Sequence, residues 1–156
     1  MGGGGLLRFD RANAYWWRKP LVRLGNRATT AELAVLASKL RPNERGVWLN
    51  SRPKASGVVE LLPKHRMKGP TFRTRREALP LFVVAGLEAI YNQAQVSRGC
   101  PDLVIWRTDR EQFRLVEVKC PHWDRPSSEQ ERFIEIATER GIEARVVEWE
   151  FRERAA

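Results

Sequence analysis

Hydrophobic and polar residues follow their most regular pattern in the second half of the chain. An apolar run over 102–106 and an alternating run over 113–119 are separated by the polar, turn-like residues 108–111. Two short runs rich in β-forming residues around such a turn are typical of a β-hairpin. The pattern therefore predicts that 102–106 and 113–119 are neighbouring antiparallel strands.

The hydrophobic period changes to that of a helix after a loop over 121–126. Ser127 is suited to cap a helix over about 129–140, and Gly141 is suited to end it. A last strand is predicted over 142–151. The apolar face of the helix would consist of Phe133, Ile136 and Ala137.

Helical spacing also occurs twice in the first half of the chain. The residues Thr29-Thr30-Ala31-Glu32 are typical of a capping box, and leucines at 33, 36 and 40 follow at helical intervals. We expect this helix to end before Pro42 and a short strand to follow over 46–50. A second helix is predicted from Glu77 or Pro80 to about Tyr91.

The remaining segments contain many turn-forming residues. We interpret residues 1–28 as an irregular N-terminal arm and residues 51–76 as a basic loop or hairpin insertion. The whole chain, 1–156, is short enough to form a single domain. The predicted order of elements favours a mixed α/β fold with a small central sheet flanked by helices.

Charge is distributed unevenly along the chain. Lys and Arg number 28 and Asp and Glu number 19, for a net charge of +9. The first 99 residues hold 18 basic and 6 acidic groups, whereas the last 57 hold 10 and 13. This asymmetry predicts a surface that binds a polyanion such as nucleic acid, beside a part that uses carboxylates. The alternative is a basic soluble protein with no nucleic-acid role.

Other classes of protein fit the composition poorly. The longest apolar run, 79–90, is shorter than the roughly 18 residues that a membrane helix needs, so no membrane partner is expected. The start of the chain does not match a secretory signal, which favours a cytoplasmic location. Cys100 and Cys120 have no histidine at zinc-binding spacing and are expected to be reduced thiols.

Three residues of the predicted hairpin suggest chemistry. Asp102 starts one strand, and Glu117 and Lys119 lie near the end of the other, so antiparallel pairing would bring them together. Two converging carboxylates stay ionised together only beside a cation, and hard oxygen ligands suit Mg²⁺ or Mn²⁺. With an adjacent lysine, this set fits phosphodiester hydrolysis. The alternative is an ordinary hairpin with a surface salt bridge between Glu117 and Lys119.

Longer stretches around these residues resemble a known family. Residues 99–106, 113–121, 124–125 and 127–130 occur in the order and with the gaps of the VRR-NUC nucleases, a branch of the PD-(D/E)xK superfamily. The similarity extends over 77–150 and is strongest to the C-terminal nuclease domain of the Fanconi-associated nuclease. The resemblance implies a restriction-endonuclease-like αβββαβ core and divalent-metal cleavage of branched or flapped DNA.

The resemblance also implies roles for individual residues. Asp102, Glu117 and the backbone carbonyl of Val118 would bind Mg²⁺ or Mn²⁺, and Lys119 would be the catalytic lysine. Gln130 would help to order the site near the scissile phosphate. Without the resemblance, Gln130 would equally be a solvent-facing helix residue.

The chain departs from the family pattern around the lysine. Cys120 replaces the usual glycine and would narrow the approach of a phosphate backbone. The loop 121–126 is one residue longer than usual and brings in Trp123, which would either stack on an exposed base or pack within the loop.

A further acid is usual in the first helix of the family. Glu32 is the better candidate, because a predicted strand follows its helix, although a capping-box glutamate needs no catalytic role. Glu88 is the alternative, but only fourteen residues separate it from Asp102.

Candidate DNA contacts lie in the first half of the chain. A dense basic run can follow phosphates without reading bases, although it can also be a solvated charged face. Residues 15–19 mix aromatic rings with cations and would either stack on a splayed strand or pack on the core. The basic run comprises Lys64, Arg66, Lys68, Arg73, Arg75 and Arg76.

Together these features predict a metal-dependent, structure-selective endonuclease. We expect it to cut branched DNA, a Holliday junction or a flap, and to act as a homodimer. The alternatives are a DNA-binding module that has a nuclease-like fold but does not cut, and a nuclease that acts on RNA or single strands.

Overall fold

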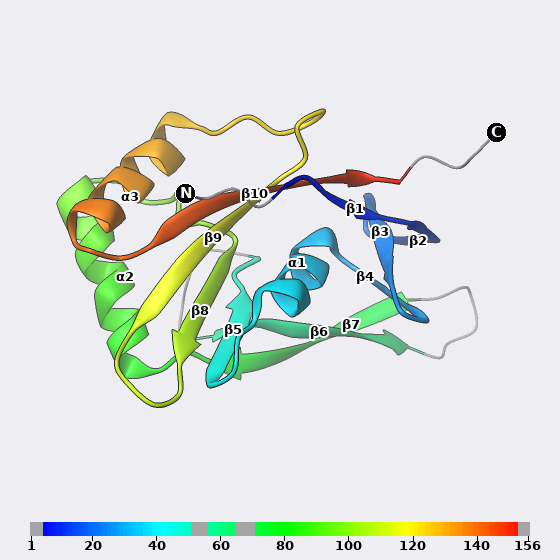
Figure 1. The fold of residues 1–156 in the computed structure, drawn as a ribbon, viewed down its shortest axis with the longest axis horizontal. Helices are drawn as coiled ribbons and strands as arrows, with labels where there is room; N and C mark the ends of the chain where they lie inside the picture. The colour runs from blue at the N-terminus through cyan, green and yellow to red at the C-terminus, as the bar shows by residue number, and fades with distance from the viewer. Residues whose placement is uncertain (1–4, 51–55, 65–70, 153–156) are drawn as a thin grey trace.

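The computed structural model describes residues 5–50, 56–64 and 71–152. Within these ranges the chain forms mixed α/β structure, with strands and helices arranged as Figure 1 shows. The elements in chain order are β1 (Leu7–Phe9), β2 (Arg11–Trp16), β3 (Lys19–Leu24), β4 (Arg27–Thr29), α1 (Ala31–Lys39), β5 (Glu44–Trp48), β6 (Ser56–Lys64), β7 (Thr71–Ala78), α2 (Leu81–Ala94), β8 (Leu103–Arg107), β9 (Phe113–Lys119), α3 (Ser128–Glu139) and β10 (Ala144–Phe151).

Seven strands form the main sheet, in the order β1-β10-β9-β8-β5-β6-β7. The four central strands carry the predicted core: β5, β8 and β9 pair antiparallel, and β10 pairs parallel to β9 after crossing over through α3. The order α1-β5-β8-β9-α3-β10 is the expected αβββαβ arrangement, with β6, β7 and α2 inserted after its first strand. The predicted fold class is therefore confirmed.

The predicted hairpins and helices are found close to their expected positions. Strands β8 and β9 pair antiparallel as the predicted hairpin, with Leu103 opposite Val116. Residues 56–64 and 71–78 form the hairpin that was one of two predictions for 51–76. Helix α3 begins after Ser127, whose side chain accepts a hydrogen bond from the Gln130 amide. Among the described helices, none is both long and apolar enough to cross a membrane.

The interpretation of residues 1–28 as an irregular arm is wrong for the part described. β1 joins the edge of the main sheet beside β10, and β2, β3 and β4 form a separate antiparallel sheet. In β2 the inward positions are Ala12, Ala14 and Trp16, which pack against the core. Alanine is a weak β-former, so the alternation of this strand was inconspicuous in the sequence.

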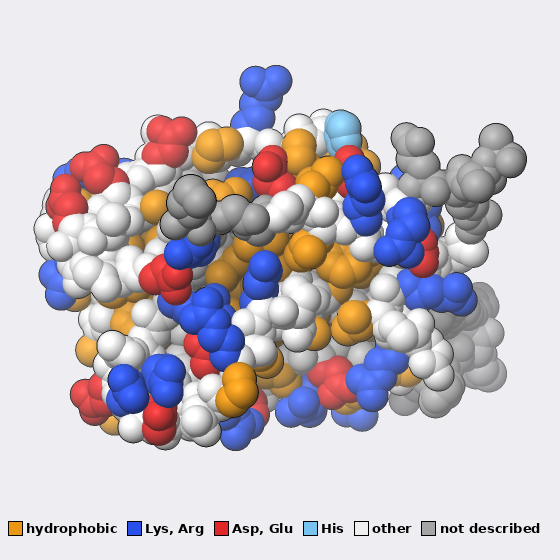
Figure 2. Space-filling model, viewed as in Figure 1, with side chains coloured by type: hydrophobic (Ala, Val, Ile, Leu, Met, Phe, Trp, Pro, Cys, Tyr) orange, Lys and Arg blue, Asp and Glu red, His pale blue; other side chains and the backbone are white. Residues whose placement is uncertain are grey.

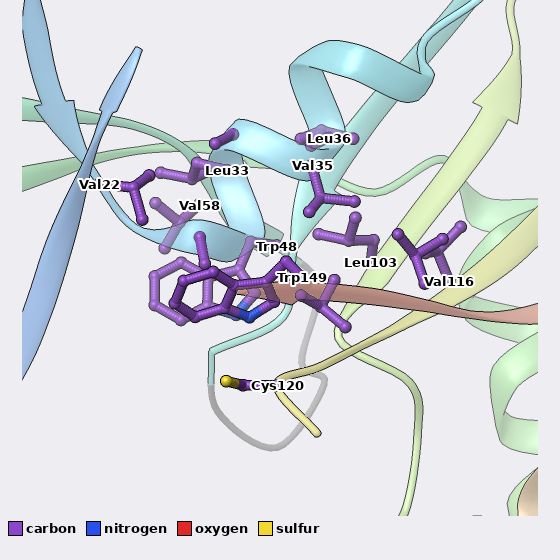
Figure 3. Close-up of a cluster of buried hydrophobic side chains, with 14 of the residues drawn as sticks. Val22, Leu33, Val35, Leu36, Trp48, Val58, Leu103, Val116, Cys120 and Trp149 are labelled. Atoms are coloured by element: carbon purple, nitrogen blue, oxygen red, sulfur yellow. The ribbon is translucent and has the colours of Figure 1, made fainter. Parts of the chain in front are cut away.

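The central sheet separates two hydrophobic layers because its side chains alternate between the two faces. On one face, α1 and β3 cover residues such as Leu103, Val116 and Trp48, some of which are shown in Figure 3. On the other face, α2 and α3 cover Val104 and Leu115. The acidic site described below lies at the end of β9.

A buried ion pair joins three elements at the opposite end of the central strands. Arg114 of β9 donates hydrogen bonds to both carboxylate oxygens of Glu44, at 3.0 and 3.1 Å, and to the carbonyl of Lys39 at the end of α1. The two side chains are only 10% and 5% exposed. Burial alone would raise the pKa of Glu44, but hydrogen bonds from Arg114 and the Arg41 amide hold it below its ordinary value.

This pair should contribute measurably to stability. Glu44→Gln is expected to lower the free energy of unfolding by about 3 kcal/mol near neutral pH, because it leaves a buried guanidinium unpaired. The wild-type contribution is complete above pH 4.5, the ordinary pKa, and is lost as the pH falls through the lower pKa of folded Glu44. Urea unfolding at about pH 7 and about pH 3 measures both effects.

The matched control is Glu135→Gln, which removes an exposed partner of Arg132. We expect that change to cost less than about 0.5 kcal/mol. Equal losses in the two variants at neutral pH would contradict a structural role for the Arg114–Glu44 pair.

Candidate active site

Asp102 and Glu117 meet at the end of the β8–β9 hairpin. Leu103 pairs with Val116, which places the preceding Asp102 opposite Glu117. The Asp102 carboxylate accepts a hydrogen bond from the Val118 amide at 2.8 Å, and its carbonyl accepts one from the Leu49 amide at 2.8 Å. Asp102 is thus fixed between β5 and β9, with its carboxylate beside that of Glu117.

Glu117 is a buried acid in an unfavourable environment. Glu117 is 2% exposed, and its Oε2 atom has no hydrogen-bond partner within the described part of the protein. Burial raises the pKa of Glu117 to about 9; the hydrogen bond and negative charge of Asp102 add to this, and Lys119 opposes it. Buried polar atoms without partners are rare in proteins, and they often mark sites where a ligand binds.

A second buried acid approaches from α1. Glu32 is 9% exposed, and one of its carboxylate oxygens accepts a hydrogen bond from the Lys19 ammonium at 2.8 Å. Its other oxygen is buried without a partner among the described residues. Burial raises the pKa of Glu32, Lys19 opposes this, and the negative charge of Asp102 raises it further. Glu32 therefore belongs electrostatically to the same site.

The capping role considered for Glu32 is wrong. Thr30 caps α1 by accepting a hydrogen bond from the Leu33 amide at 3.2 Å, so Glu32 is the second helical residue and its side chain turns to Lys19. The alternative acid, Glu88, is exposed on α2, whereas Leu87 and Ile90 of the same helix are buried. The structure thus places Glu32, and not Glu88, near Asp102.

Lys119 and Gln130 also lie in contact with each other. The Lys119 ammonium donates a hydrogen bond to the Gln130 side-chain oxygen at 3.2 Å. The same oxygen accepts the Ser127 amide at 2.9 Å, which completes a capping box at the start of α3. Gly99, with φ of 116°, lies so close that a Cβ there would be 2.6 Å from the Glu129 carbonyl oxygen. This close approach holds the start of α3 against the loop that leads to Asp102.

Of the residues after the lysine, Cys120 differs from its prediction. Cys120 is buried in the hydrophobic layer on the α1 side of the sheet, so its side chain does not narrow the approach to the site (Figure 3). Trp123 is 59% exposed, and its ring makes edge-to-face contacts with Trp149 and Phe151. Trp123 therefore both packs on the sheet and presents a face to solvent.

The predicted DNA-contacting residues are only partly described. Arg66 and Lys68 lie outside the described residues, and Lys64 ends β6 with its side chain undescribed. Arg73, Arg75 and Arg76 are exposed on β7. Arg75 contacts Glu60, which also pairs with Arg27 of β4, and Arg76 donates hydrogen bonds to Ser56 and Asn50.

Lys19 is a site residue that the sequence interpretation missed. It was grouped with the aromatic residues of an arm thought to be irregular, whereas it begins β3 and reaches Glu32. Its ammonium also lies 5.9 Å from the centre of the Trp48 ring. The turn signal Gly25-Asn26 between β3 and β4 indicated a hairpin here, but no local signal indicated the contact with Glu32.

No three His, Cys, Asp or Glu side chains within 5–50, 56–64 and 71–152 come close enough to hold a metal ion by themselves. The site instead combines two adjoining carboxylates, a third acid from another element and two lysines. Such a cluster can bind a cation whose remaining ligands are water or substrate oxygens, as is usual for Mg²⁺.

Comparison with known proteins identifies the family. Residues 42–149 match the family model of the VRR-NUC domain, so the chain belongs to the VRR-NUC family. This confirms the resemblance that the sequence motifs carried. β1 to β4 and α1, which hold Lys19 and Glu32, precede the matched range.

Two solved structures are similar to this chain. They are described as crystal structures of paFAN1 bound to 2nt and to 1nt 5′ flap DNA with gap, with 26% and 27% sequence identity and TM-scores of 0.39 and 0.38. The similarity covers 46% and 49% of this chain but only 14% of each paFAN1 chain. A search of curated proteins finds no match.

The raised pKa of Glu117 predicts a pH dependence of stability in the absence of divalent ions. Because the folded pKa lies above the ordinary 4.5, this group's contribution is complete below pH 4.5 and is lost as the pH rises through about 9. Glu117→Gln cannot ionise and should show a flatter decline of Tm between about pH 6 and pH 9, measured in EDTA. Glu111→Gln, an exposed turn residue, should keep the wild-type slope; parallel profiles for wild type and Glu117→Gln would contradict the buried ionisation.

Proposed function

We propose that this protein is a divalent-metal-dependent endonuclease that hydrolyses phosphodiester bonds in branched DNA. The observation that carries the proposal is the pair of adjoining carboxyl groups of Asp102 and Glu117. The Glu117 carboxyl is buried, and one of its oxygens has no hydrogen-bond partner among the residues that the structure describes. Lys119 follows on the same face of β9 as Glu117. Membership of the VRR-NUC family supports the same chemistry.

The donor set fits Mg²⁺ or Mn²⁺. Asp102, Glu117 and the carbonyl of Val118 would hold the ion, with Glu32 as a further acid. A divalent cation there would satisfy the unpartnered oxygen of Glu117 and cancel the repulsion that raises its pKa. When bound, the ion would lower the pKa of a water molecule and stabilise negative charge on the phosphate.

The protein's own residues would position the reacting groups. Gln130 holds the Lys119 ammonium at the start of α3, where its positive charge is close enough to Glu117 to lower the pKa of that acid. An ammonium so fixed can orient an attacking water or stabilise charge that develops on a phosphate oxygen. Lys19 holds one oxygen of Glu32 and leaves the other free to bind.

DNA would approach over the basic side of the protein. Figure 2 shows several Lys and Arg side chains towards the right of the face viewed, over the region of the β2–β4 sheet, and others over its centre and lower left. Arg73 on β7 is exposed, and Glu60 connects Arg75 of β7 with Arg27 of β4. These groups, with Lys64 and with Arg66 and Lys68, which follow it in the sequence and lie outside the described residues, would contact phosphates without reading bases.

The oligomeric state that cleavage requires would depend on the type of branched DNA. Symmetric cleavage of a four-way junction requires two sites related by a two-fold axis and therefore a homodimer. Cleavage of a flap requires one site. A single cut or paired cuts on labelled DNA would thus report the assembly as well as the substrate.

A cleavage assay tests the proposed function. Wild type is expected to nick labelled junction or flap DNA with Mg²⁺ or Mn²⁺ and not with EDTA. Asp102→Asn and Glu117→Gln should abolish nicking yet bind DNA at least as tightly, because each removes a negative charge. Lys119→Ala should slow nicking by about 100-fold or more. Glu32→Gln should reduce nicking, whereas Glu88→Gln, the exposed matched control, should not.

Two outcomes would contradict the proposal. Binding of branched DNA without any metal-dependent nicking would indicate a non-cleaving module. Faster cutting of matched RNA or single strands would indicate the other predicted alternative.

Metal binding can be measured separately from cleavage. Mn²⁺ at about 100 times its Kd should raise the Tm of wild type by roughly 5–10 °C. At one fixed Mn²⁺ concentration the shift should be larger near pH 8 than near pH 6, because Glu117 must lose its proton to bind and the Kd is therefore lower at pH 8. Asp102→Asn should abolish the shift and Glu88→Gln should keep it. An equal shift in all three proteins would place the ion elsewhere.

A further inference from the structure

The turn between β2 and β3 presents an unusually exposed aromatic residue beside the candidate active site. Trp16 pairs with Lys19, so Trp17 and Arg18 form a two-residue hairpin loop. Trp17 is 85% exposed, and Tyr15, two residues earlier on the outward face of β2, is 63% exposed. The loop is part of the small sheet at the right of Figure 1.

The backbone at Trp17 is unfavourable for a bulky residue. Its φ is 58°, in the left-handed region, and the first position of a two-residue hairpin loop with positive φ favours glycine. A tryptophan held there gains no burial to offset the strain. Such strain at an exposed position is typical of a residue kept for binding.

The residues on either side of the loop fix its position relative to the acids. Trp16 packs edge-on against Trp48, with ring centres 5.5 Å apart, and Lys19 bonds to Glu32 at 2.8 Å. Two residues of extended chain span at most about 7 Å, so the backbone of Trp17 lies within that distance of the backbone of Lys19, whose side chain reaches Glu32. The loop is therefore tied to this acid by one short segment and one side chain.

From this arrangement we infer that Trp17 stacks on an unpaired base of branched DNA beside the part of the candidate active site that Glu32 forms. Arg18, exposed in the same loop, is placed to contact the adjoining phosphate. Aromatic rings bind unpaired bases of any identity, because every base has a stacking face. The inference rests on the proposed function and adds a reason for selecting branched over fully paired DNA.

The test measures binding in EDTA, so it does not depend on cleavage. The probes are a duplex with a single-stranded branch, with 2-aminopurine as the first unpaired base, and a fully paired duplex of equal length. Trp17→Gly should weaken binding of the branched DNA about tenfold and leave the duplex affinity within about twofold. Wild type should quench the 2-aminopurine fluorescence and Trp17→Gly should not.

Two further variants control the experiment. Trp17→Phe keeps a ring and should retain most of the affinity and quenching, whereas Leu81→Ala removes an equally exposed apolar side chain on α2 and should change nothing. Glycine suits the positive φ, so the Tm of Trp17→Gly should be no lower than that of wild type. A lower Tm would remove the strain argument and overturn the inference.

Other results would also overturn it. Unchanged affinity of Trp17→Gly for the branched probe, or equal losses on both probes, would show that the ring does not engage an unpaired base. Dissociation of a wild-type dimer into monomers by Trp17→Gly in analytical ultracentrifugation would show that a second copy covers the ring. Absence of nicking by wild type, with the branched-probe result intact, would instead contradict the proposed function alone.

Discussion

The pairing register of β8 against β9 is the constraint on which the candidate site depends. With Leu103 opposite Val116, Asp102 and Glu117 share one face and one end of the hairpin. A slip of one residue would turn Glu117 and Lys119 to the α1 side of the sheet, where Val116 and Val118 now pack. The alternating buried residues of β9 therefore determine both how the strand packs and where the candidate site residues lie. The buried Arg114–Glu44 pair reinforces this register from the other end of the strand.

The site concentrates acids where the protein alone does not neutralise them. Glu32 and Glu117 come from elements far apart in sequence, yet burial raises the pKa of both, and the charge of Asp102 raises each further. Lys19 and Lys119 offset part of this cost: Lys19 donates a hydrogen bond to Glu32, and Lys119 donates one to Gln130. A folded protein retains such an arrangement at the expense of stability, which is common where preorganised charge serves binding or catalysis.

Local patterns were sufficient to predict the elements whose residues interact mainly with near neighbours. The β8–β9 hairpin, the Ser127 cap of α3 and the order of the core all follow from periods and turn signals within short windows. The β2–β4 sheet was not predicted, because alanines occupy inward positions of β2 and its turn contains Trp17 and Arg18 instead of glycine. The contact between Lys19 and Glu32 depends on how that sheet packs on α1, and no periodicity within either segment specifies it.

Gln130 connects secondary structure with the candidate catalytic lysine through a single atom. Its side-chain oxygen is the acceptor both for the amide that closes the first turn of α3 and for the ammonium of Lys119. Unwinding of that turn would therefore release the lysine at the same moment. The position of the Lys119 ammonium therefore depends on the first turn of α3. A partner that binds the loop before this helix would change the position of Lys119 in the candidate site.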